Sequence, residues 1–153
     1  MVDNVTFEKT TYNVLPYKYE AGTTNYVGAI GLKTALDYIS SIGIDKIARY
    51  EKSLLNYATE KLTSIDGLEI YGTAENKISI ISFLLDNIHH YDAGLVLDKL
   101  GIAVRTGTHC NQPVMDYYGV SGTLRASMVF YNSKNDIDLF LAAVKKAKEM
   151  LGK

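Results

Sequence analysis

The sequence contains no tryptophan, only two prolines and a single cysteine, Cys110. One cysteine cannot form a disulfide within its own chain, and a chain without disulfides fits a reducing compartment. Neither sign of charge is in excess, because 16 basic and 17 acidic side chains give a formal net charge of -1. A protein that binds nucleic acid normally carries a basic face, so this balance argues against that class.

Long apolar segments are also missing from the sequence. No apolar run is long enough to cross a bilayer. The first residues, MVDNVTFEKTTY, lack the apolar core of a signal peptide. Together with the lone cysteine, these absences predict a cytoplasmic protein without a membrane partner.

The residues that are present predict a small globular protein. The 153 residues are 47% apolar and 22% charged, which suits one domain with a buried core. Residues 1–22 show no helical periodicity and are predicted to be extended or irregular. Apolar spacing then predicts a helix with the stripe Ala29, Leu32, Leu36 and Ile39, a break at Gly43, and a second helix with a stripe from Ile47 to Ile65. Strands are predicted at Leu68–Tyr71 and Ile78–Leu85, followed by a helix from about Asp92 to Leu100 that stops at Gly101. The last predicted elements are a strand at Ile102–Arg105, a loop at Thr106–Pro113, a strand from Leu124 to Tyr131, and a helix that Ser133 and Asp136 cap and that extends to Leu151.

This order of elements indicates the fold class. The predicted elements follow in the order helix, helix, strand, strand, helix, strand, loop, strand and helix. We therefore predict a small α/β or α+β domain, in which helices pack on a short, mostly antiparallel sheet.

The segment Arg105–Pro113 is the most informative for chemistry. It follows a predicted strand and places His109 next to Cys110 in a polar loop. A reactive cysteine needs partial exposure and positive or donor-rich surroundings, because the thiolate is the nucleophile, and Arg105 and His109 could supply them. A lone cysteine is also often a small buried apolar residue, and that alternative stays open from the loop alone.

Other cysteine chemistries fit this sequence poorly. A thioredoxin-type site needs two cysteines, and phosphatase-like loops place an arginine after the cysteine, whereas Arg105 precedes it. A zinc site is not expected, because an adjacent His-Cys pair cannot easily chelate one tetrahedral ion. The whole inventory of histidine and cysteine is His89, His90, His109 and Cys110.

Two other residues have both a structural and a functional interpretation. Thr23, in the segment Gly-Thr-Thr-Asn, is either an ordinary helix cap or part of an anion site at the first turn of the helix. Arg125 lies in a strand and faces away from Leu124 and Ala126, so it either forms a surface ion pair or captures a carboxylate with its two-pronged guanidinium.

Three motifs, in order, resemble the C-terminal part of SUF-type cysteine desulfurases, which are pyridoxal-phosphate enzymes grouped with the class V aminotransferases. Gly101–Pro113 reads GIAVRTGTHCNQP, where this family typically has GIAVRTGHHCAQP. Tyr19–Asn25 reads YEAGTTN against FEAGTPN, and Thr123–Ser127 followed by Tyr131-Asn132 matches a TxRAS…YN signature. The resemblance extends from about Tyr19 to Leu151 and implies the small domain of a fold-type I pyridoxal-phosphate enzyme.

The resemblance implies roles for four residues. Cys110 would attack the sulfur of a substrate L-cysteine, leaving alanine and a persulfide for iron–sulfur cluster assembly. Arg125 matches the arginine that holds the substrate carboxylate, and Thr23 matches the threonine that reaches the cofactor phosphate of the neighbouring subunit in a homodimer. His109 matches the second histidine of the family pair, next to the nucleophile. A sulfur-acceptor protein of the SUF system is the implied partner.

Departures from the family pattern limit these expectations. Thr108 and Asn111 replace a histidine and an alanine beside Cys110, and Thr24 replaces a proline. The family's cofactor lysine belongs to a large N-terminal domain, and no matching lysine motif occurs here. We therefore expect residues 1–22 to be a linker from that domain and residues 23–153 to be the small C-terminal domain, inactive alone and without covalently bound pyridoxal phosphate.

Alternative functions fit the same motifs. Selenocysteine lyases share most of the pattern, and another class V aminotransferase-like enzyme is a further possibility. A stand-alone carrier that receives a persulfide on Cys110 from a separate enzyme is the alternative from a different class.

Overall fold

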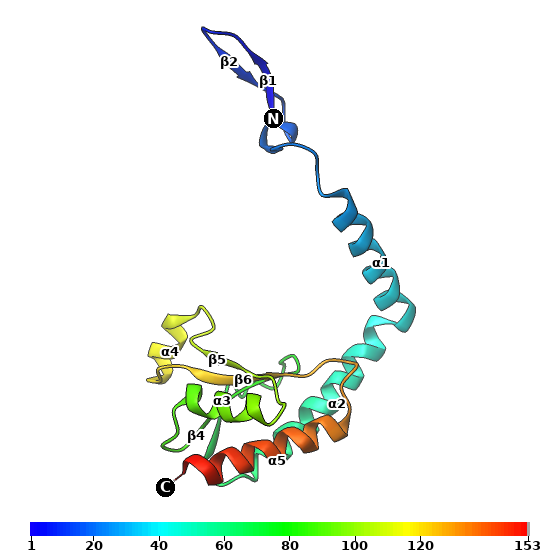
Figure 1. The fold of residues 1–153 in the computed structure, drawn as a ribbon. Coiled ribbons are helices and arrows are strands. Elements are labelled where there is room, and N and C mark those ends of the chain that lie inside the picture. The colour runs from blue at the N-terminus through cyan, green and yellow to red at the C-terminus, as the bar shows by residue number, and fades with distance from the viewer. Residues whose placement is uncertain (153) are drawn as a thin grey trace. The chain divides into compact units, whose positions relative to one another are not determined.

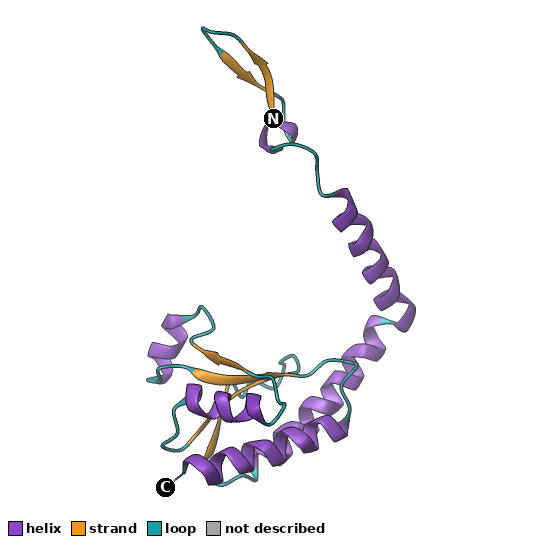
Figure 2. Ribbon diagram, viewed as in Figure 1, coloured by secondary structure: helices purple, strands orange, loops and turns teal. Residues whose placement is uncertain are grey.

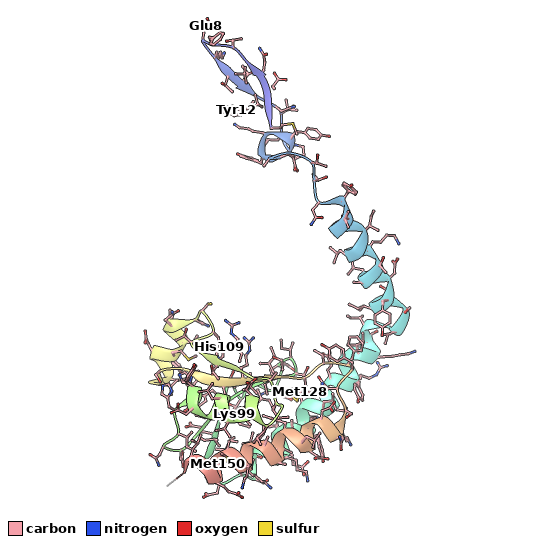
Figure 3. The ribbon with its side chains drawn as sticks, in the orientation of Figure 1. Glu8, Tyr12, Lys99, His109, Met128 and Met150 are labelled. Atoms are coloured by element: carbon pink, nitrogen blue, oxygen red, sulfur yellow. The ribbon has the colours of Figure 1, made fainter. Side chains whose placement is uncertain are left out.

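The computed structural model describes residues 1–152 and divides the chain into two compact units, one from Met1 to Ile44 and one from Asp45 onward. The first unit begins with a hairpin, in which β1 (Val2–Val5) pairs antiparallel with β2 (Thr10–Tyr12). Glu8 lies at the tip of this hairpin (Figure 3). A 3-10 turn, η1 (Tyr17–Tyr19), follows. The prediction of extended or irregular chain over residues 1–22 is confirmed, apart from this single turn.

The long helix α1 (Tyr26–Ile42) completes the first unit. Its N-cap is Asn25, whose side-chain oxygen accepts a hydrogen bond of 2.9 Å from the backbone N–H of Gly28. The prediction that Thr23 caps this helix is therefore wrong, because the helix begins later and asparagine is itself among the best capping residues. Gly43, with a φ of 95°, ends the helix where the sequence predicts a break.

A four-stranded sheet forms the centre of the second unit (Figure 1). Its strands are β3 (Leu68–Tyr71), β4 (Ile80–Leu85), β5 (Arg105–Gly107) and β6 (Thr123–Ser127). Their spatial order is β3-β4-β6-β5, and every neighbouring pair is antiparallel. The predicted fold class, a short antiparallel sheet with helices packed against it, is confirmed.

Helices cover one face of this sheet (Figure 2). They are α2 (Ile44–Thr63), α3 (His90–Lys99) and α5 (Lys134–Leu151). Side chains alternate along a strand, so the buried residues of β4 and β6 point to this face while their neighbours point to the other. The buried cluster includes Leu54, Leu62, Ile81, Phe83, Leu97, Leu124, Val144 and Ala147.

The seven-residue helix α4 (Gln112–Tyr118) lies on the opposite side of β6 from α3 (Figure 1). Tyr118 packs edge-on against Tyr71 of β3, with ring centroids 5.3 Å apart. No apolar stripe in the sequence predicts so short a helix, although Pro113 in its first turn favours one.

Three strands differ in their boundaries from the predicted ones. Strand β4 begins at Ile80 and not at Ile78. The predicted strand Ile102–Arg105 is wrong in position, because β5 begins only at Arg105, where pairing with β6 starts. The predicted strand from Leu124 to Tyr131 ends instead at Ser127. Beyond it, a carboxylate oxygen of Glu51 accepts a hydrogen bond from the backbone N–H of Phe130 at 3.0 Å, which holds the chain in a turn.

Helix ends in this unit agree with the sequence. Ser133 and Asp136 form the predicted capping box at the start of α5. Gly101, with a φ of 81°, follows the last turn of α3 as expected. Within residues 1–152, no helix combines the length and the apolar character that crossing a membrane demands.

Candidate active site

Cys110 lies in a tight turn between β5 and α4. His109 and Cys110 have φ values of 56° and 59°, a left-handed conformation that is uncommon for residues other than glycine. The turn is closed by a hydrogen bond of 3.0 Å from the Asn111 N–H to the Thr108 carbonyl. Strained backbone of this kind persists only where surrounding contacts hold it, and it presents Cys110 as an exposed free thiol.

Two arginines face the turn from neighbouring strands. Arg105 and Arg125 are direct partners in the β5–β6 ladder, so their side chains leave the same face of the sheet. Arg105 Nη2 donates a hydrogen bond to Cys110 Sγ at 3.7 Å. None of the ion pairs within residues 1–152 involves either arginine.

The side chain of Arg125 has a hydrogen-bond donor, its Nε, that is not used within the described residues. Its Nε is buried and has no hydrogen-bond partner. Two adjacent guanidinium groups without a carboxylate, one of them with a buried free N–H, form a site that favours an anion. Because Arg105, the strand partner of Arg125, donates to Cys110 Sγ, an anionic molecule held by the two guanidinium groups would lie close to this thiol.

His109 fastens the turn to β6. Its Nε2 shares a hydrogen bond of 2.9 Å with the hydroxyl of Thr123, a residue that is 1% exposed. Burial, and then the positive charges of Arg125 and Arg105, lower the pKa of His109 below its ordinary value. The imidazole is therefore neutral near pH 7. Figure 3 shows His109 at this end of the sheet, beside α4.

The lowered pKa of His109 has a consequence that NMR can measure. We expect its ring protons to titrate with a midpoint below about 6.5, the ordinary value for histidine. The unfolded chain binds this proton more readily, so stability is complete above about pH 6.5 and decreases as the pH falls below it. Replacing Arg125 by methionine removes a neighbouring positive charge and should raise the midpoint of His109.

An arginine far from the turn in sequence provides the control. Arg49 is exposed on α2, and Arg49→Met should leave the midpoint of His109 unchanged. A midpoint of 6.5 or higher in the unaltered chain would contradict the inferred burial of the imidazole. A midpoint that did not rise in Arg125→Met would contradict the influence of that guanidinium.

The structure brings together three of the four residues that the sequence singles out. Cys110, His109 and Arg125 meet at one end of the sheet in the second unit. Thr23 belongs to the first unit, where it is exposed. Thr123 was not predicted to take part, although it begins the strand motif that carries Arg125.

Among the described residues, no group of three or more His, Cys, Asp or Glu side chains is arranged to hold an ion. The turn also brings two guanidinium groups close to the imidazole and the thiol, and guanidinium groups favour an anion over a cation.

Comparison with known proteins identifies the family. The model of the class V aminotransferases matches residues 1–140. The chain belongs to this family. Class V aminotransferases are pyridoxal-phosphate enzymes, so the cofactor implied by the sequence motifs is that of the family.

Similar proteins within this family are named cysteine desulfurases. A probable cysteine desulfurase of Xylella fastidiosa strain 9a5c is 45% identical over 152 residues, which are 99% of this chain and 36% of that protein. A cysteine desulfurase of Salmonella agona strain SL483 is 44% identical over 143 residues, or 94% of this chain and 35% of the relative. The chain thus spans about a third of the length of these relatives.

Solved structures confirm the fold. The cysteine desulfurase CsdA of Escherichia coli has a TM-score of 0.87 at 37% identity, with 99% of this chain and 37% of that one covered. The apo cysteine desulfurase of Thermococcus onnurineus NA1 has a TM-score of 0.86 at 34% identity, with 98% and 38% covered. The predicted family resemblance is confirmed, while its narrower SUF type stays a prediction.

Proposed function

We propose that this chain is the C-terminal part of a cysteine desulfurase, in which Cys110 takes the sulfur atom of L-cysteine. The observation that carries the proposal is the exposed Cys110 Sγ, which lies 3.7 Å from the Nη2 of Arg105, the strand partner of Arg125. The proposed nucleophile and the arginine proposed to hold the substrate carboxylate both adjoin Arg105, the first by its hydrogen bond and the second by strand pairing. The match to relatives named cysteine desulfurases supports the same function.

The arginines bind and orient the substrate. The guanidinium of Arg125 can hold the carboxylate of cysteine with two parallel hydrogen bonds. Arg105 adds a second positive charge across the β5–β6 pair and donates to Cys110 Sγ, which favours the anionic nucleophile. His109, neutral near pH 7, keeps the turn tied to Thr123.

The sulfur transfer conserves atoms and electrons. The Cys110 thiolate forms a bond to the sulfur of substrate cysteine as the bond between that sulfur and the substrate β-carbon breaks. The β-carbon takes up a proton, so that alanine leaves and a persulfide remains on Cys110. Pyridoxal phosphate, when bound, supplies the electron sink that weakens the carbon–sulfur bond.

The remaining roles concern the whole protein. Thr23, exposed ahead of α1, would bind the cofactor phosphate of a neighbouring subunit in a homodimer, and the linker and small domain would be residues 1–22 and 23–153. The persulfide would pass to a sulfur-acceptor protein of the SUF system for iron–sulfur cluster assembly in the cytoplasm. The exposure of Cys110 supports such a transfer, because an acceptor thiol must reach its sulfur.

The proposal is tested by comparing this chain with a longer protein that carries it as its C-terminal third. Each is incubated with pyridoxal phosphate and L-cysteine, and alanine is measured by mass spectrometry. We expect alanine from the longer protein only. Steady alanine formation by the 153-residue chain alone would contradict its assignment as part of a larger enzyme, and no alanine from the longer protein would contradict the desulfurase activity.

A further inference from the structure

His90 is a buried histidine that the proposed chemistry does not use. It is the first residue of α3 and is 9% exposed, whereas its neighbour His89 is exposed and caps the helix. The two rings lie against one another, with centroids 4.2 Å apart. The Nδ1 of His90 is buried without a hydrogen-bond partner, so hydrogen bonding at this atom does not explain the presence of a histidine here.

The other nitrogen of this ring, Nε2, lies next to Gly122, where the chain passes close to Gly107. A Cβ atom placed on Gly122 would lie 2.5 Å from His90 Nε2 and 2.9 Å from the carbonyl carbon of Gly107. The imidazole therefore contacts Gly122, and Gly122 contacts the backbone of Gly107, with no room among them for one further carbon atom. Gly107 and Gly122 have φ values of 110° and 159°, which residues with side chains rarely adopt.

Both glycines adjoin the parts of the site that hold Cys110. Gly107 is the last residue of β5 and leads directly into the turn of His109 and Cys110. Gly122 precedes Thr123, whose hydroxyl shares the hydrogen bond with His109. The imidazole of His90 thus supports the turn from both ends, through the strand that enters it and through the residue that anchors it.

We propose that His90 is a positioning residue for Cys110: its ring, packed against Gly122 and through it against Gly107, holds the left-handed turn so that Sγ stays beside Arg105. The value of this arrangement for sulfur transfer rests on the proposed function. The geometry itself, and the test below, do not depend on any cofactor or on cysteine.

The charged groups around His90 agree with a neutral imidazole in this place. Burial and the charge of His89 lower the pKa of His90, and Asp92 in the same helix opposes them. In the turn, the charges of His90, Arg105 and Arg125 all lower the pKa of His109. A protonated His90 would add positive charge behind a site that already holds two guanidinium groups, so a packing role fits better than an acid–base role.

The test uses the 153-residue chain and its only thiol. Iodoacetate is anionic and iodoacetamide is neutral, so the ratio of their alkylation rates reports how close the positive charges lie to Sγ. We expect this ratio to be at least about threefold higher in the folded chain than in urea, and to fall toward the urea value in Arg105→Met. These two results establish that the ratio reports the arginine next to the sulfur.

His90→Ala should then lower the ratio about threefold while circular dichroism shows a folded chain. His90→Gln, which keeps a polar atom near the position of Nε2, should restore most of it. The matched control is His89→Asn, which alters the exposed neighbour and keeps a capping side chain, and it should change the ratio less than about 1.5-fold. If His90→Ala does not fold, His90→Asn replaces it, because its shorter side chain also withdraws from Gly122.

A folded His90→Ala or His90→Asn chain with the ratio of the unaltered protein would overturn the proposal. So would equal ratios in the folded and urea-treated chain, since Arg105 would then not be held beside the sulfur. Neither result would change the outcome of the alanine assay. A failed alanine assay would contradict the desulfurase activity, and it would leave the alkylation ratio as it is.

Discussion

A Cys110→Ser variant of the longer protein is expected to lose alanine formation from L-cysteine by at least about a thousandfold in kcat. A serine hydroxyl is a far weaker nucleophile toward sulfur than a thiolate and cannot form a persulfide. Arg125 remains in place to bind the substrate carboxylate, so KM should change by less than about threefold. The large effect should therefore appear in kcat, which separates loss of the nucleophile from loss of binding.

Alanine and persulfide are measured together in this experiment. Mass spectrometry of the unaltered protein should show one added sulfur atom on Cys110, which dithiothreitol removes. Ser53→Ala, on the exposed side of α2, is the control and should leave kcat within about twofold of the original. A Cys110→Ser protein that formed alanine at the original rate would rule out Cys110 as the sulfur acceptor.

The second large effect concerns stability. Phe83, in β4, is 0% exposed and packs edge-on against Phe140 of α5, with ring centroids 5.8 Å apart. Phe83→Ala removes a whole ring from the centre of the sheet and leaves a cavity that the two layers cannot close. We expect the free energy of unfolding to fall by about 3–5 kcal/mol.

Urea denaturation followed by far-UV circular dichroism measures this change. Phe7→Ala, in the hairpin of the first unit, removes the same ring from a fully exposed position and should change the free energy by less than about 0.5 kcal/mol. A loss below about 1 kcal/mol for Phe83→Ala would show that the sheet and α5 are not packed as described.

Elements with a long apolar pattern were predictable from the sequence. The stripe that includes Ile137, Phe140 and Val144 lies against the sheet in α5, and the alternation around Arg125 correctly separates its two faces. The capping box at Ser133 marks the start of α5 because its two hydrogen bonds depend only on residues three apart. Local rules were sufficient for these features.

Other features depend on contacts between distant parts of the chain. Ile102 and Val104 have strand-like character, but they pack partly against the core ahead of β5 instead of pairing with β6. The strand β6 ends early because Glu51, far away in sequence, binds the N–H of Phe130. Neither shift could be derived from the composition of the segment in which it occurs.

In the candidate site, too, some features follow from the sequence and others depend on contacts between distant segments. The composition of its loop and the family motifs identify Cys110, His109 and Arg125 as candidates. The pairing of Arg105 with Arg125 is a matter of strand register, and the contact of His90 with the glycine ahead of β6 arises only when α3, β5 and β6 meet. No periodicity distinguishes His90 from the exposed His89 beside it.

The strand order also determines when this site can exist during folding. Strands β3 and β4 pair across a short connection, whereas β4 and β6 pair residues roughly 40 positions apart, such as Phe83 and Leu124. Closing so long a segment lowers the conformational entropy of the chain before the contacts between the two strands can stabilise it, so we expect this pairing to form late. Cys110 lies inside that segment, and Arg125 lies on the strand that closes it. We therefore expect that in a partly folded chain the thiol, which is exposed in the folded structure as well, can already be oxidised while the two arginines have not yet been paired beside it.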